Sequence, residues 1–177
     1  MKKAFLLLLI LQSWMGYAQH WKPSSSSVTF KIKHALGATA DGSFKGLLGT
    51  ILFDPNTLAT ANLKASIDAN SIDTGVKIRD KALRSDEYFD VVKYPKISMT
   101  SVKIEKGAKE NEYWGLFNLT IKKTTKNVRI PFTFSQNGAT AQFKSTFQIN
   151  RLEYEIGEKS ALLGDIATVT ITLNVQQ

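Results

Sequence analysis

The segment VTFKIKH, residues 28–34, decides the fold class because apolar and charged side chains alternate along it. On an extended strand Val28, Phe30 and Ile32 share one face, whereas Lys31 and Lys33 share the other. The same period of two recurs at residues 62–68, 127–134, 141–149 and 168–175. This pattern predicts an all-β protein in which each strand buries one face.

Three further strands are predicted from less regular segments. At residues 42–54 and 96–104 the apolar phase changes midway, and Gly46 and Gly49 in the first of these predict a bend or bulge. Residues 113–121 are apolar on both faces near their start. Pro131 lies inside a predicted strand and has no N–H for a ladder, which predicts an edge position or a local break. Short connections make neighbouring strands antiparallel, and eight such strands fit one closed barrel or a tight sandwich.

The charged side chains decide which face of the sheet is inside. The cations on the polar faces are Lys31, Lys33, Lys64, Arg129 and Lys144, and Asp68 is almost their only counter-charge. Burying unpaired cations costs several kcal/mol each, whereas on the outer face they reach water. We therefore predict an apolar interior.

One connection, residues 69–95, is too long to be a structureless loop in a compact domain. It contains SIDTGVKIRDKALRSDEYFD, residues 71–90, in which Asp73 and Thr74 are suited to cap a helix that carries Val76, Ile78 and Leu83. The sequence thus predicts a helical excursion between the third and fourth strands, over one end of the sheet.

The carboxylates of this excursion raise the question of catalysis. Arg79, Lys81 and Arg84 lie near them in sequence, so helix caps and ion pairs are the expected roles. His34 is the only histidine within the predicted strands, and the chain has no G-x-S-x-G turn, no histidine cluster and no EF-hand loop. We predict that the protein is not an enzyme and has neither a metal site nor a cofactor.

Residues 1–18 are predicted to be a signal peptide. Lys2 and Lys3 precede an apolar run that is too short to span a bilayer, and Gly16-Tyr17-Ala18 suits a signal peptidase. The mature domain would be residues 19–177, located in the periplasm or secreted. The chain contains no cysteine, which excludes a disulfide, a thiolate site and a lipoprotein anchor.

The formal net charge is +8, of which Lys2 and Lys3 contribute two units. No basic run marks a nucleic-acid surface, so no nucleic-acid partner is expected. The excess charge leaves open a transient contact with an anionic membrane surface. After removal of the signal peptide no transmembrane span is expected, and a homodimer also stays open.

Composition leaves two descriptions of the interior open. The inward positions combine phenylalanines with small residues such as Ala65, Gly115, Ala141 and Ser145. Aromatic walls with gaps suit an apolar ligand, but cores and pockets share this composition. The interior is therefore either hollow or filled.

Several motifs, in order and spacing, resemble the YceI-like family over residues 20–175. They are VTFKIKH at 28, GSFKGLLGTILFDP at 42, SIDTGVKIRDKALRSDEYFDVVKYPKIS at 71, GLFNLTIKKTTKNVRIP at 115 and INRLEYEIG at 149. The resemblance implies a lipocalin-like, eight-stranded antiparallel β-barrel that is exported to the periplasm. It also implies an interior that binds a polyisoprenoid, an isoprenoid quinone or a related long-chain lipid, without a cofactor.

On this basis we expect an exported protein that sequesters or carries a long-chain lipid. The alternative is a filled barrel that serves as a periplasmic protein-interaction or stress-response module. The expected apolar lining is Phe30, Ile32, Phe44, Ile51, Phe53, Leu63, Ile67, Ile97, Met99, Phe117, Phe132, Phe134, Phe143 and Phe147. The expected polar residues at the mouth, which would contact a head group, are His34, Arg79, Arg84 and Arg151.

Overall fold

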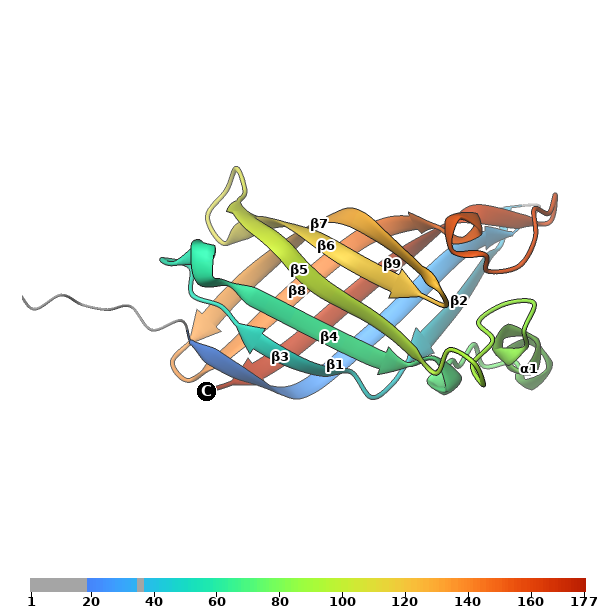
Figure 1. Cartoon of the computed structure of the whole chain (residues 1–177), viewed down its shortest axis with the longest axis horizontal. Helices are drawn as coiled ribbons and strands as arrows, with labels where there is room; N and C mark the ends of the chain where they lie inside the picture. The colour runs from blue at the N-terminus through green and yellow to red at the C-terminus, as the bar shows by residue number, and fades with distance from the viewer. Residues whose placement is uncertain (1–18, 35–36) are drawn as a thin grey trace, which may run out of the picture.

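A computed structural model describes residues 19–34 and 37–177 and shows one antiparallel sheet that closes on itself (Figure 1). The predicted signal peptide at residues 1–18 lies outside the described residues. The strands are β1 His20–His34, β2 Thr39–Phe44, β3 Leu48–Leu52, β4 Asn62–Asp68, β5 Lys96–Lys106, β6 Glu112–Ile121, β7 Thr124–Asn137, β8 Thr140–Asn150 and β9 Leu163–Gln176. The helices are α1 Lys77–Arg84 and the short 3-10 helices η2 Leu58–Thr60, η3 Ala69–Ser71 and η4 Arg151–Tyr154.

Pairing of β1 with β9 closes the barrel, since the other strands follow one another in chain order from β3 to β9. β2 and β3 both pair with the opposite edge of β1, as Val28↔Phe44 and Trp21↔Ile51. Seven residues separate the two positions on each side, so β2 and β3 are one strand in one register. The chain leaves the ladder around Gly46, whose φ is +71°, as the predicted bend requires. Gly49, the other glycine of that prediction, instead lies within the β3–β4 ladder opposite Ala65.

Counted in this way the barrel has eight strand positions, and the predicted fold class is confirmed. The connection that carries η3 and α1 lies between the third position, β4, and the fourth, β5. Figure 1 shows α1 at one end of the barrel, opposite the end where β1 begins and β9 finishes.

The phase changes in the sequence correspond to β-bulges. In β5 the register against β6 shifts between Ser101 and Lys103, which turns Val102 outward to an exposure of 56%. In β1 a shift between Pro23 and Ser25 lets both Trp21 and Val28 face inward, although seven residues separate them. Because this bulge interrupts the alternation, the sequence predicts β1 only from residue 28, whereas the strand begins eight residues earlier.

Pro131 lies at a break in the barrel wall. The sequence predicts either an edge position or a local break there, and the structure shows the break. β7 pairs with β6 past Pro131, but its ladder with β8 covers only residues 133–137. The Ser145 hydroxyl donates to the Pro131 carbonyl oxygen at 2.6 Å in place of a backbone bond. Ion pairs Lys126–Glu153 and Lys123–Glu155, at 3.0 and 2.9 Å, hold η4 and the residue after it beside the β6–β7 hairpin.

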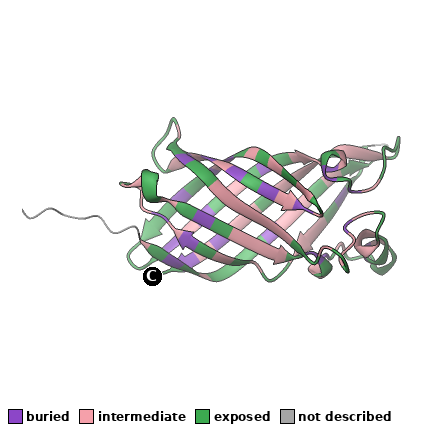
Figure 2. Cartoon of the chain, in the orientation of Figure 1, coloured by how far each residue is buried: buried purple, intermediate pink, exposed green. Residues whose placement is uncertain are grey.

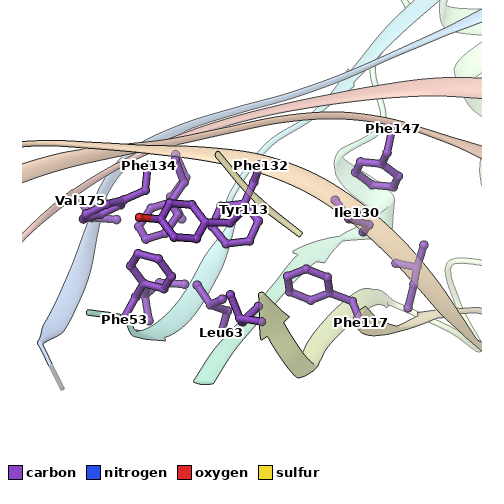
Figure 3. Close-up of a cluster of buried hydrophobic side chains, with 14 of the residues drawn as sticks. Phe53, Leu63, Tyr113, Phe117, Ile130, Phe132, Phe134, Phe147 and Val175 are labelled. Atoms are coloured by element: carbon purple, nitrogen blue, oxygen red, sulfur yellow. The ribbon is translucent and has the colours of Figure 1, made fainter. Parts of the chain in front are cut away.

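The end of the barrel away from α1 is filled by an aromatic plug, which we define as Trp21, Phe53, Tyr113, Phe132, Phe134 and Phe143. Phe53 is completely buried, and its ring centroid lies 4.8 Å from that of Phe134 and 5.2 Å from that of Tyr113. The Trp21 indole N–H donates to the Phe53 carbonyl at 3.0 Å. Figure 3 shows the rings of Phe53, Tyr113, Phe132 and Phe134 gathered together, with Phe117 and Phe147 farther along the barrel. In this half the interior is filled.

Candidate functional site

The other half of the barrel encloses a cavity of about 370 Å³, called here the main cavity. Inward side chains on its walls, such as Phe30, Ile97 and Val169, are only half-buried although they face the interior. Figure 2 shows this half-buried class along the strands toward α1, whereas fully buried residues concentrate toward the plug. The interior is therefore hollow in this half of the barrel and filled in the other half.

The predicted apolar residues divide between two spaces. Those that line the main cavity are Phe30, Ile32, Phe44, Ile67, Ile97, Met99 and Phe147. A second space of about 80 Å³, the inner pocket, is lined among others by Ile51, Leu63, Met99, Phe117, Phe132 and Phe143. Phe53 and Phe134 line neither space, because they lie inside the plug.

The main cavity and the inner pocket share four lining residues. Leu47, Ala65, Met99 and Ile171 line both spaces, so these side chains form the partition between them. They come from the bend between β2 and β3 and from β4, β5 and β9. The inner pocket therefore lies between the main cavity and the plug.

Several lining residues were not in the predicted set. Leu83, Tyr88 and Phe89 enter the wall from the excursion, where no alternation marks an inward face. Val169 is on β9, whose period of two did predict an inward face, whereas Ala167 precedes the predicted segment 168–175. Gly42 on β2 makes room for Phe30, one of the predicted lining residues, because a Cβ at position 42 would lie 2.3 Å from the Phe30 ring.

The excursion borders the mouth of the main cavity and contains a hydrogen-bonded turn. α1 begins at Lys77 with Val76 as its N-cap, so the predicted Asp73–Thr74 cap is wrong. Instead the buried Asp80 carboxylate accepts from the Thr74 backbone N–H at 2.9 Å and the Thr74 hydroxyl at 2.5 Å. A carboxylate in the first turn of α1 thus accepts hydrogen bonds from donors that precede the helix.

Arg79 lines the main cavity and is positioned by the same turn. Its Nε donates to the Thr74 hydroxyl at 2.8 Å, and its Nη2 donates to the Thr74 carbonyl at 2.9 Å. His34, at the end of β1, also lines the cavity and is exposed. Because His34 and the exposed Ala82 belong to the lining, the cavity reaches the surface at this end.

Arg84 does not line the main cavity. Its guanidinium donates to the carbonyls of Asn70 and Ile72, at 2.9 and 2.5 Å, and so ties α1 to η3. The expected ion pairs of the excursion are mostly replaced by such bonds. Among the described residues, Asp73 is the one carboxylate of residues 71–90 in a salt bridge, and its partner is Lys45 at 3.5 Å. The hydrogen bond from the Gly75 backbone N–H and, to a smaller extent, the contact with Lys45 lower the pKa of the Asp73 carboxyl.

Arg151 lines the main cavity but is only 4% exposed. It donates to the carbonyls of Gly164, Ile156 and Glu158 at 2.8–3.0 Å, and its Nη2 lies 3.6 Å from Asp165 Oδ1. These bonds hold the segment between η4 and β9. Arg151 therefore shapes the wall of the cavity, and most of its donors are already engaged.

Tyr154 in η4 is 2% exposed, and burial raises the pKa of its hydroxyl to about 12. The group stays neutral at physiological pH and acts as part of the apolar core. Within residues 19–34 and 37–177 no three His, Asp or Glu side chains are grouped as metal ligands. No helix in the part of the chain that the structure describes has the length and hydropathy to cross a bilayer.

Comparison with known proteins assigns this architecture to a family. The family model for the YceI-like domain matches residues 20–176. Protein YceI of Salmonella newport (strain SL254) and Protein YceI of Salmonella arizonae are each 36% identical over 103 residues, which is 58% of this chain and 53% of theirs. The chain thus spans about half the length of the curated relatives it matches.

Solved structures agree in fold. Burkholderia cenocepacia BcnA superimposes with a TM-score of 0.79 and 28% identity, over 84% of this chain and 95% of BcnA. A polyisoprenoid binding domain from Saccharophagus degradans gives a TM-score of 0.71 over 90% of this chain and 98% of that domain, with 13% identity. At that identity the second likeness concerns the fold alone. With a domain match that extends from the first strand to the last, the chain belongs to the YceI-like family.

Proposed function

We propose that this protein binds one long-chain lipid, with the tail in the main cavity and the head group at the α1 end. The observation that carries the proposal is the 370 Å³ cavity, which has apolar walls and reaches the surface beside His34 and Ala82. A tail gains about 0.8 kcal/mol for each methylene that leaves water, so ten methylenes contribute about 8 kcal/mol before ordering costs. No hydrogen bond along the tail is needed.

The relatives favour this type of ligand. The domain from Saccharophagus degradans is described as polyisoprenoid-binding, and it has the same fold. For this chain the candidate ligands are a polyisoprenoid, an isoprenoid quinone or a fatty-acyl compound. Arg79 is the cation best placed for the head group, because Thr74 holds it at the rim and it also lines the cavity.

We also propose binding without catalysis. The polar groups beside the cavity are engaged in structural bonds: Asp80 with Thr74, and Arg151 with three carbonyls. Neither residue is presented to a substrate as a free acid or base. Export of the protein, by cleavage after residue 18, is part of the same proposal and rests on the leader-like sequence.

The direct test is extraction of the purified protein with organic solvent, followed by mass spectrometry of the extract. We expect a single-tailed lipid at up to one molecule per chain. A matched control is the protein with Ala167→Trp, produced in the same cells, in which the cavity is obstructed and the lipid should be missing. Empty extracts from folded wild-type protein, together with no saturable binding of added fatty acids or prenols, would refute the proposal.

A further inference from the structure

We propose that the barrel measures the length of the tail, and that the partition of Leu47, Ala65, Met99 and Ile171 stops it after about 15 carbons. This inference rests on the proposed function, because it concerns the ligand of the same cavity. It adds a limit on the ligand class: tails near this length are fully enclosed, whereas much longer isoprenoids are not.

The volume of the main cavity sets the number. An apolar cavity of about 150 Å³ accommodates benzene, which corresponds to about 25 Å³ for each carbon. At that density the main cavity of 370 Å³ holds about 15 carbons, and the inner pocket of 80 Å³ adds about three. A tail of about 40 carbons would leave more than half of its length outside both spaces.

Met99 is the side chain in the partition that is best able to act as the stop. On β5 it pairs with Ala65 of β4 on one side and Leu119 of β6 on the other, so it projects from the middle of the wall. Ala65 beside it is too small to close the passage. Methionine is flexible and fills irregular gaps, which suits a residue that separates two apolar spaces.

Beyond the partition the plug prevents further entry. The ring centroids of Phe53 and Phe143 are 5.4 Å apart, and those of Phe134 and Phe143 are 4.8 Å apart. A tail could advance only by separating rings that are packed in contact. Additional carbons must therefore remain at the mouth in water, where they add nothing to affinity.

A chain-length series tests the limit. The delipidated protein is titrated with unbranched fatty acids of 8 to about 24 carbons, each below its critical micelle concentration, in competition with a fluorescent acyl probe. Affinity should rise about fourfold with each added carbon and become level near 15 carbons. A steady rise through the longest acid would overturn the length limit while leaving lipid binding intact. Absence of saturable binding at every length would instead overturn the proposed function.

Two variants locate the stop. Met99→Ala should join the inner pocket to the main cavity and move the plateau to about 18–21 carbons. Ile97→Ala is the matched control: it also removes three heavy atoms from β5, and it lines the main cavity but not the inner pocket. That change should widen the main cavity without opening the partition, so the plateau should move by fewer carbons than in Met99→Ala. Equal shifts in both variants would show that Met99 is not the stop.

If Met99→Ala lowers the thermal midpoint so far that titration fails, Leu47→Ala opens the same partition. Leu47 is half-buried and lies in the bend between β2 and β3, outside the ladders, so its truncation should disturb the sheet less. The plateau should again move to longer acids. An unchanged plateau in a folded Leu47→Ala protein would contradict the position assigned to the partition.

Discussion

Phe53→Ala is expected to lower the free energy of unfolding by about 3–5 kcal/mol, the range for a large aromatic residue removed from a packed core. Phe53 is completely buried and makes ring contacts with Tyr113, Phe132, Phe134 and Phe143, at centroid distances of 5.2, 5.8, 4.8 and 5.4 Å. Its truncation would leave a void that none of these rings can fill without leaving the others. Chemical denaturation, monitored by tryptophan fluorescence, measures the loss.

The matched control is Phe30→Ala in the wall of the main cavity. Phe30 is half-buried and, among the residues that the structure describes, has one aromatic neighbour, Phe44, at 5.6 Å. Because its ring already borders open space, we expect a loss of about 1–2 kcal/mol, below the core range. Lipid affinity should change more in this variant than its stability does. Equal stability losses for Phe53→Ala and Phe30→Ala would contradict a barrel that is filled at one end and hollow at the other.

Ala167→Trp is expected to reduce the affinity for a 16-carbon fatty acid by at least about 100-fold. Ala167 lines the main cavity from β9, between Ile32 of β1 and Ile149 of β8. The indole adds nine heavy atoms to a space that holds about 15, so most of the tail is excluded. Titration with the acyl probe measures this loss.

The control for Ala167→Trp is Thr170→Trp on the same strand. Thr170 is exposed on the outer face of β9, so the same indole is added to solvent. Affinity should then equal that of the wild-type protein. Both variants should unfold near the wild-type denaturant midpoint, because one ring enters open space and the other stays outside. Unchanged affinity in folded Ala167→Trp would mean that the tail does not occupy the main cavity.

The barrel was predictable because its walls follow one simple rule. Alternation in segments such as VTFKIKH divides the side chains between an apolar and a charged face of the sheet. The charges then specify that the apolar face points into the barrel. The bend at Gly46 and the break at Pro131 were also predictable from the sequence. Glycine readily adopts a positive φ, and proline has no N–H to donate to a strand ladder. The first part of β1 was missed because a bulge changes its phase.

The division of the interior was not predictable from residue type. Phe30 lines the main cavity and Phe53 lies in the plug, although both are inward phenylalanines. Their surroundings differ because the pairing of β7 with β8 sets Phe134 opposite Phe143. The rings of Phe132 and Phe134 then both contact Phe53. The turn residues QNG at 136–138 predict that hairpin, so its register is the signal that could have located the plug.

The arginines show a second limit of sequence reasoning. Charge and motif context place Arg79, Arg84 and Arg151 together at the mouth, but their acceptors are mainly carbonyl oxygens, which carry no sequence signature. Arg84 ties α1 to η3 and does not reach the cavity, whereas Arg151 is buried in its wall. Only a three-dimensional structure separates a cation that holds the backbone from one that is available to a ligand.

In the proposed complex, a lipid tail enters the barrel from the α1 end and stops before the aromatic plug. The most direct measurement is a crystal structure of the protein with a 16-carbon fatty acid that carries bromine on its terminal carbon, in which anomalous scattering locates the bromine. We expect one bromine peak per barrel, beside Met99 and Ile171, with the carboxylate near Arg79. Bromine peaks confined to the outer surface, with an unchanged cavity, would contradict this proposal.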